Sequence, residues 1–371
     1  MTTAMDRAGL AELMTAAMTG DHEQSVGLPF RLQSGEVKTF AIEVNGDADV
    51  PREVDRLGRA VGLRSLETAD PALAILWDDA SGLFVDVLDE RFWLVHTTGP
   101  KGWVQPKLQN LVARSRNVDW CWLTTSMMND LRVRGMQRWF KADFKGQDLL
   151  PSEGTRGRRL KVQLEGDNPD ELQSLLVDGG YRSSTALTGV ALRLQSAELG
   201  SVQEAAYYRG SFSARGDSFD LHLGFVAAVV GAYAEEVRDV ERRFAIRWGG
   251  EEGHGWELTA GGVITISFAR PIVSFDQFLD GLFSCREPFR LWSVPRAAGD
   301  DFVEAEVVDL HVGQRFRLDI TRGGLRVYLF DGACGNTLFR LLANLQHRYD
   351  AAASSPDLPR RQPAHPRSSA Q

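Results

Sequence analysis

Apolar and polar side chains alternate in strand-like stretches, which are separated by stretches with helical spacing. Residues 37–44 alternate as a strand with one buried face, and Pro51 opens a helix that reaches about Val61. Short strands follow at 73–77, 83–88 and 92–96. The order of strand, helix and two or more strands recurs further along. The pattern therefore predicts an α+β fold, in which repeated strand-helix-strand-strand units form mixed or antiparallel sheets with helices packed on one face.

The middle of the chain predicts two helices around one strand. The helices are expected at residues 106–116 and from Ser126 to about Phe144, with the strand at 118–124. The apolar face of the second helix is expected to contain Met128, Leu131, Met136, Trp139 and Phe140. A further strand is expected at 159–164, after a polar loop.

Two later segments, residues 211–220 and 267–276, resemble each other. Each ends a strand and then presents Ser-Phe-Asp. The hydroxyls of Ser218 and Ser274 suit the N-cap position, where they accept hydrogen bonds from free amides of the first helical turn. The similarity suggests an internal duplication within residues 201–350.

A chain of 371 residues exceeds what one hydrophobic core usually organises. The element order predicts an N-terminal α+β domain at 1–104, a middle α/β segment at 105–200 and a C-terminal α+β domain at 201–350. Residues 351–371 contain almost no large apolar side chain, so they cannot offset their ordering entropy and are expected to form a disordered tail.

Composition restricts the function classes. The chain has 42 Lys and Arg against 50 Asp and Glu, a net charge of −8, which argues against a dedicated duplex-binding protein. Its six lysines among those 42 basic residues are taken as the mark of a GC-rich, bacterial genome rather than of phosphate recognition. No apolar run is long enough to cross a membrane. We therefore expect a cytoplasmic, folded protein.

The three cysteines are Cys121, Cys285 and Cys334, far apart and without a CxxC pair. This spacing encodes neither a disulfide framework nor a thiolate zinc site, and fits a reducing compartment. The histidines form no recognisable ligand motif. The sequence therefore predicts no metal site and no cofactor.

Cys334 and Arg340 have the spacing found in cysteine phosphatases. In such a loop, backbone amides and the arginine hold the phosphate, the helix end lowers the thiol pKa, and Asp331 would be the general acid. Leu338 and Phe339, however, place apolar bulk where bare amides should face the phosphate. A hydrolase with Cys334 as its nucleophile is therefore kept as a secondary alternative.

Strand-borne basic residues suggest an alternative that ranks ahead of the hydrolase, the binding of RNA or single-stranded DNA on an aromatic sheet. The candidate contacts are Arg156, Arg158, Arg159, Lys161, Arg315 and Arg317. Arg315 and Arg317 also alternate with apolar residues, and Glu304 and Glu306 alternate likewise on the preceding strand. Those two arginines are therefore expected to form cross-strand ion pairs.

The leading hypothesis from the sequence is a non-catalytic scaffold or adaptor, which acts by protein-protein interaction within a larger assembly. It rests on the lack of any clustered nucleophile, base or metal set, together with nine Trp and nineteen Phe that exceed what small units can bury. Protein partners are expected, nucleic acid is the alternative partner, and no membrane contact is expected.

Overall fold

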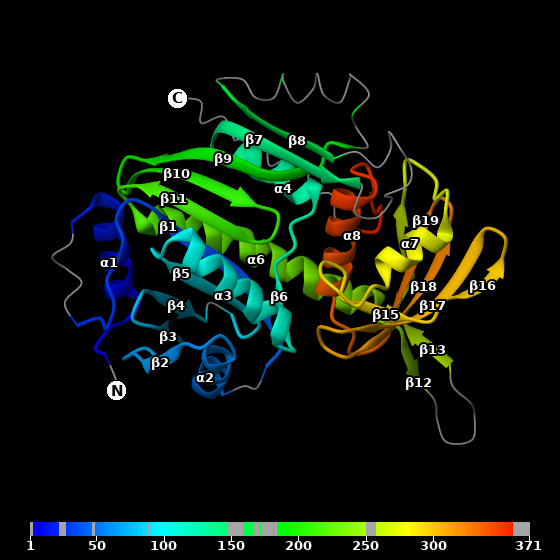
Figure 1. Cartoon of the computed structure of the whole chain (residues 1–371), viewed down its shortest axis with the longest axis horizontal. Coiled ribbons are helices and arrows are strands. Elements are labelled where there is room, and N and C mark those ends of the chain that lie inside the picture. Colours follow the sequence, from blue (N-terminus) through cyan, green and yellow to red (C-terminus); the bar gives the residue numbers. More distant parts are fainter. Residues whose placement is uncertain are drawn as a thin grey trace.

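Two antiparallel sheets and a two-stranded ribbon organise the chain (Figure 1). The computed structural model describes residues 3–21, 27–46, 49–87, 89–146, 159–166, 171, 181, 184–249 and 257–358. The larger sheet has eleven strands, in the order β2-β3-β4-β5-β1-β11-β10-β9-β7-β8 with β6 beside β1. Its strands are β1 Val37–Val44, β2 Arg64–Glu67, β3 Leu73–Trp77, β4 Gly82–Asp86, β5 Phe92–Thr97, β6 Val118–Trp120, β7 Met136–Lys145, β8 Arg159–Glu165, β9 Leu187–Ser196, β10 Gly200–Tyr207 and β11 Ser211–Gly216. The α+β class with antiparallel sheets is thus confirmed.

The smaller sheet has the order β14-β19-β18-β17-β15, with β16 also paired to β17. Its strands are β14 Ile264–Ser267, β15 Leu291–Ser293, β16 Arg296–Gly299, β17 Phe302–Asp309, β18 Arg315–Thr321 and β19 Gly324–Leu329. The ribbon consists of β12 Arg247–Gly249 and β13 Glu257–Ala260. The larger sheet crosses the divisions expected near residues 104 and 200, and the domain scheme itself stays a prediction.

Helices cover both faces of the larger sheet, because alternation along each strand buries side chains on both sides. Phe84 packs with α1, whereas its neighbour Val85 packs with α2 and α3 on the opposite face. The described helices are α1 Arg7–Thr19, α2 Val50–Ala60, α3 Lys101–Arg114, α4 Thr125–Leu131, α6 Phe219–Phe244, α7 Phe275–Leu282 and α8 Asn336–Arg348. None of these is both long and apolar enough to span a bilayer.

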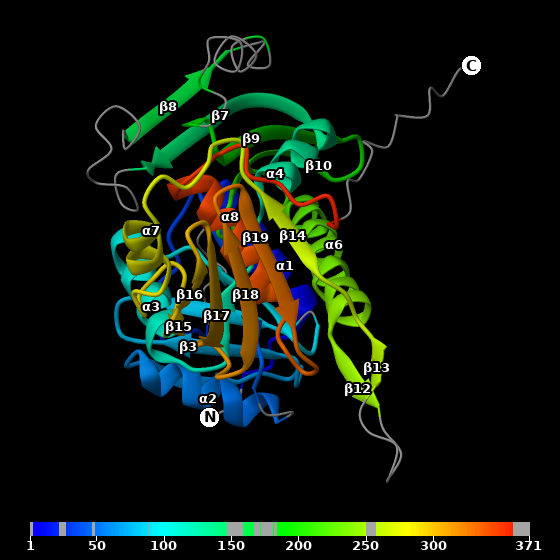
Figure 2. The ribbon, with the colours of Figure 1, turned by 90° about the vertical axis from the view of Figure 1, so that its right-hand side faces the viewer.

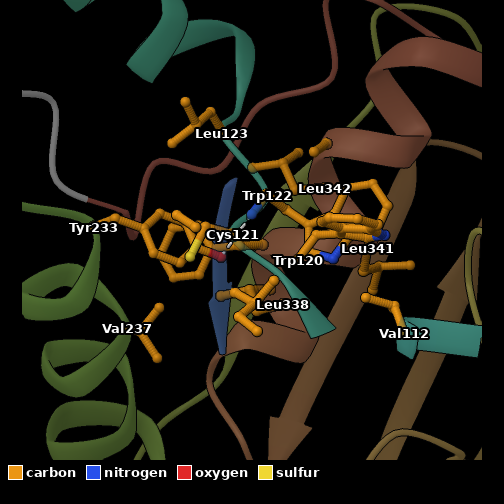
Figure 3. Close-up of a cluster of buried hydrophobic side chains, with 14 of the residues drawn as sticks. Val112, Trp120, Cys121, Trp122, Leu123, Tyr233, Val237, Leu338, Leu341 and Leu342 are labelled. Atoms are coloured by element: carbon orange, nitrogen blue, oxygen red, sulfur yellow. Dashed lines mark hydrogen bonds between the residues drawn. The ribbon is translucent and has the colours of Figure 1, made fainter. Parts of the chain in front are cut away.

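Helix α8 lies between the two sheets, behind strands β17, β18 and β19 in Figure 2. A buried cluster joins it to α6 and to the segment that follows β6 (Figure 3). There the Trp122 amide donates a hydrogen bond to the Tyr233 hydroxyl (3.0 Å), which in turn donates to Asn336. One hydrophobic core therefore includes both sheets.

Both predicted serine N-caps are confirmed. The Ser218 hydroxyl accepts from the Leu221 amide at 3.1 Å, at the start of the 26-residue α6. The Ser274 hydroxyl accepts from the Gln277 amide at 3.5 Å, at the start of α7. The internal duplication stays a prediction.

The helix predicted from Ser126 to Phe144 is wrong beyond Leu131, where α4 ends. After the extended Gly135, residues 136–145 form β7, which pairs with β8 and β9. Its apolar residues at 136, 140 and 144 are four apart, a spacing that lies on one face of a helix and also on one face of a strand. Hydrogen bonding to β8 on one side and β9 on the other favours the strand over the helix.

The predicted disordered tail begins too early. Ala351 and Ala353 are buried, Ser354 forms a β-bridge with Ser267, and the Asp357 carboxylate accepts from the Thr265 amide at 2.8 Å. Small side chains suffice here because the backbone provides most of the contacts. Residues 351–358 therefore belong to the folded body, and residues 359–371 lie outside the described residues.

Removing residues 351–371 is therefore expected to lower the free energy of unfolding by about 2 kcal/mol or more, since several hydrogen bonds each contribute roughly 1 kcal/mol net. The control deletes only 359–371 and keeps every described contact. Urea unfolding followed by circular dichroism measures both. Equal stability of the two truncated proteins would contradict the docking of residues 351–358.

Candidate functional site

A groove of about 700 Å³ opens over one face of the larger sheet. A cross-strand row on its floor runs from Phe40 through Ser211, Tyr207 and Gly189 to Lys141. Residues directly opposite each other in antiparallel strands point to the same face. Ser211 and Gly189 have small side chains, so this row is lower at these two positions and a hollow forms above the sheet. Part of α3 forms a wall.

Aromatic rings lie on this floor. A Cβ placed on Gly189 would come within 3.0 Å of the Tyr207 ring and 3.2 Å of the Trp139 ring, so both rings lie directly over the glycine backbone. The ring centroids of Trp139 and Tyr207 are 6.1 Å apart. Both side chains are only half-buried. Gly189 thus lets two aromatic side chains lie along the sheet with part of their surface accessible.

The groove is basic although the chain is acidic. Its basic lining residues are Lys38, Lys101, Lys141, Lys145, Arg209 and Arg348. Only two acidic residues, Glu36 and Asp143, line it as well, which leaves an excess of four positive charges against −8 for the chain. A positive excess confined to one hollow is what an anionic ligand requires.

Several of these lysines lack a partner charge. Among the residues that the structure describes, Lys101, Lys141 and Lys145 form no ion pair. Burial lowers the pKa of Lys141, and repulsion from Lys161, Lys101 and Lys145 acts in the same direction, while Asp143 opposes it. Lys38 differs, because Glu36 holds its ammonium at 3.0 Å. An anion in the groove would therefore offset unbalanced positive charge.

His347 closes one end of the groove from α8. Its ring packs against the Tyr208 ring at a tilt of 54°, with centroids 4.0 Å apart. Burial lowers the pKa of His347 to about 3, so the ring is neutral near pH 7 and adds no charge to the groove.

The nucleic-acid residues expected from the sequence are divided between sites. Lys161 lies opposite Asp143 on β8 and is exposed on the groove face. The backbone of Arg159 pairs with Lys145, whereas Arg156 and Arg158 lie outside the described residues. The remaining two, Arg315 and Arg317, are on β18 of the smaller sheet. Arg317 forms the expected cross-strand ion pair, with Glu304 at 3.0 Å.

Sequence reasoning missed the principal lining residues. Trp139 and Lys141 fall within the helix predicted from Ser126 to about Phe144, and Lys145 falls at its end. The excess of arginine over lysine is attributed to genome composition. The alternation of lysine and aspartate from 141 to 145 around the apolar Ala142 and Phe144 is the signal that could have revealed a strand with one charged face.

Cys334 lies in a separate, buried polar cluster beside β1. Its thiol donates to the Glu43 carboxylate, with Sγ 3.3 Å from Oε1. Arg91 also contacts Glu43, and it pairs with Glu241 at 2.8 Å. Burial and then the Glu43 charge raise the pKa of Cys334 well above its ordinary value. The thiol is therefore protonated near neutral pH rather than an activated nucleophile.

The other two residues of the phosphatase hypothesis, Arg340 and Asp331, form ion pairs away from the Cys334 thiol. The buried Arg340 guanidinium forms ion pairs with Asp119 and Asp309. Asp331 is exposed and pairs with Arg247 at 3.3 Å. Asp331 and Cys334 line one pocket of about 400 Å³, but the arginine that should hold the phosphate is engaged by carboxylates. This geometry gives the hydrolase alternative no support.

Glu43 and Cys334 are accompanied by His311. The three side chains offer ligand atoms that all lie within 4.8 Å of one another, and all three are buried. Such a set of carboxylate, imidazole and thiol is chemically able to bind a transition metal.

A chain of hydrogen bonds runs through the core beneath α6. The Thr39 hydroxyl contacts His96 at 2.8 Å and His222 at 2.7 Å, and His222 contacts Glu204 at 2.6 Å. The order of hydroxyl, imidazole and carboxylate is that of a nucleophilic triad, but all four side chains are fully buried. These hydrogen bonds therefore satisfy some of the polar atoms in the core, although His96 Nε2 and Glu204 Oε1 have no partner among the described residues.

Comparison with known proteins places the chain in a family. A family model described as MJECL33-like protein matches residues 1–357. The chain belongs to the MJECL33-like family. A relative, MJECL33 of Methanocaldococcus jannaschii, is 23% identical over 355 residues, which cover 85% of each chain. This MJECL33 protein is archaeal, so it lends no support to the expected bacterial origin. No solved structure matches the chain.

Proposed function

We propose that this protein binds a short single-stranded segment of RNA or DNA in the basic groove of its larger sheet. The observation that carries the proposal is the combination of unpaired lysines with aromatic rings on one hollow sheet face, in a chain whose net charge is −8. Single-strand binding proteins combine these two features, a positive groove that follows the phosphates and aromatic side chains on which bases stack.

The rings and charges have complementary tasks in this proposal. Trp139 and Tyr207 offer stacking surface at the floor, where a base can lie flat on the sheet. Lys141 and Lys145 lie four residues apart on β7, so both side chains point to the same face of the sheet. A volume of about 700 Å³ limits the bound segment to a few nucleotides.

Single strands suit this groove better than a duplex. Base stacking on Trp139 requires an unpaired base, and the net negative charge of the chain opposes binding of the long, uniformly charged backbone of a double helix. We therefore expect selectivity for unpaired bases without strong sequence preference.

A protein scaffold, which the sequence favours, is the second candidate. Trp292 in the edge strand β15 and Val294 just after that strand are 49% and 75% exposed. Both are apolar and share parity along the chain, so they could form the centre of a protein contact. The groove nevertheless combines positive charge with aromatic rings, whereas this pair offers apolar surface alone.

The proposal is tested by fluorescence anisotropy with labelled single-stranded RNA and DNA at low salt. Replacing Trp139 with alanine is expected to weaken binding about tenfold, because stacking of one base on an aromatic ring contributes roughly 1–3 kcal/mol. The matched control is Trp292→Ala, which removes an exposed tryptophan from the smaller sheet.

The proposal fails if the wild-type protein binds no oligonucleotide at low salt, or if Trp139→Ala and Trp292→Ala bind equally well. Duplex DNA and mononucleotides serve as competitors. Equal competition by mononucleotides would show that the groove holds a nucleotide rather than a strand.

A further inference from the structure

We infer that Glu43, His311 and Cys334 together bind one divalent transition metal ion of the zinc type. The inference goes beyond nucleic-acid binding and uses none of the groove residues. It reverses the sequence-based expectation of no metal site.

The distances between the ligand atoms fit one ion. Cys334 Sγ lies 3.3 Å from Glu43 Oε1, and His311 Nδ1 lies 3.7 Å from Glu43 Oε2. All three ligand atoms fall within 4.8 Å of one another. A tetrahedral zinc ion with bonds of about 2.0–2.3 Å places neighbouring ligands roughly 3.3–3.6 Å apart. The set therefore needs only small side-chain adjustments to enclose the metal.

His311 provides an independent observation. Its side chain is fully buried, and neither of its ring nitrogens has a hydrogen-bond partner among the described residues. Burying a polar nitrogen without a partner costs free energy. Nδ1 faces Glu43 and, at 3.9 Å, Asp119. A metal at this point would give the imidazole the partner that it lacks.

The charge of the cluster also favours a cation. Among the described residues, the four carboxylates of Glu43, Asp119, Glu241 and Asp309 form ion pairs with two guanidinium groups, those of Arg91 and Arg340. Arg290 and Glu287 lie close by but are 3.8 Å apart, so their charges offset each other. Two negative charges remain in excess in a mostly buried region, where such an excess is costly. A divalent ion that displaces the thiol proton adds one net positive charge, so only one negative charge remains in excess.

Neighbouring groups donate hydrogen bonds to two of the three ligands. Asn336 donates to Glu43 Oε2 at 2.7 Å, and the Arg91 guanidinium donates to Cys334 Sγ at 3.2 Å. Hydrogen bonds of this kind orient metal-binding carboxylates and thiolates. Cys334 also lines the 400 Å³ pocket, from which water can supply a fourth ligand. Sulfur and imidazole ligands select zinc over magnesium or calcium.

The ligands come from three distant segments, namely β1, the loop after β17 and the loop before α8. The ion would connect the larger sheet to the smaller one, and metal binding should therefore stabilise the protein.

The test uses the full-length protein after removal of metals by chelation. Zinc binding is measured by competition with a chromophoric chelator, and the site is reported by thiolate-to-metal absorption after Co²⁺ addition. We expect one equivalent of metal, a higher unfolding midpoint with zinc, and at least tenfold weaker binding in Cys334→Ser and His311→Gln. Cys121→Ala, which removes another buried thiol, should bind as the wild type does.

Two further measurements keep the result interpretable if a variant is unstable. His311→Cys retains a metal ligand and should bind Co²⁺ with a stronger thiolate absorption, and circular dichroism checks that each variant is folded. The inference is overturned if folded wild-type protein binds less than a tenth of an equivalent of zinc, or if folded Cys334→Ser binds zinc and Co²⁺ as the wild type does.

Discussion

Replacement of Arg340 with methionine is expected to destabilise the protein by about 3–5 kcal/mol, the range for breaking a buried ion pair by removal of one partner. Arg340 is 1% exposed, and its guanidinium pairs with both Asp119 and Asp309. Methionine fills a similar volume but leaves two buried carboxylates without a counter-charge. Urea unfolding of wild type and variant measures the difference.

The pH dependence of this loss provides a second check. Burial raises the pKa of Asp119, but the Arg340 guanidinium and smaller contributions from His311 and Arg290 together outweigh burial and hold that pKa below its ordinary value. A lowered carboxyl pKa contributes stability above the unfolded pKa of about 3.9 and loses it as the pH falls through the folded value. The difference between wild type and Arg340→Met should therefore be full at pH 7 and shrink below about pH 4.

The control is Arg247→Met, which breaks the exposed pair with Asp331 and should cost less than about 1 kcal/mol. A loss of that small size for Arg340→Met would show that the buried ion pairs are not essential to the fold.

Reversal of charge at Lys141 and Lys145 is expected to weaken single-strand binding about 100-fold at low salt, roughly tenfold for each reversal. Each change removes a cation from the groove and adds a carboxylate that repels phosphate. Because each lost contact on a single strand lowers the salt slope by about 0.7, the double variant should also show a flatter dependence of affinity on salt. Anisotropy titrations across salt concentrations measure both quantities.

The matched control reverses Arg315 and Arg326, two exposed arginines of the smaller sheet, and changes the net charge by the same amount. It should alter affinity only slightly. Equal losses in both double variants would mean that overall charge, rather than the groove, determines binding.

Local features of the sequence were sufficient for much of the fold. Alternation over residues 37–44 indicates β1, and a serine before a helical stretch identifies the starts of α6 and α7, because capping depends on a hydroxyl within one turn. The Arg317 and Glu304 ion pair was also predictable, since both lie on polar faces of neighbouring strands. Each of these features depends only on residues that are close in sequence or that lie on adjacent strands.

What only the tertiary structure decided depends on distant partners. Apolar residues four apart at 136, 140 and 144 fit a helix and a strand equally well, and only pairing with β8 and β9 makes this segment β7. That pairing brings Lys141 to the same floor as Phe40 of β1, a hundred residues away. Glu43, His311 and Cys334 likewise meet only when the two sheets pack around α8. The spacing of residues along the sequence does not predict these contacts. They depend on strand register and on packing between segments that are far apart in the chain.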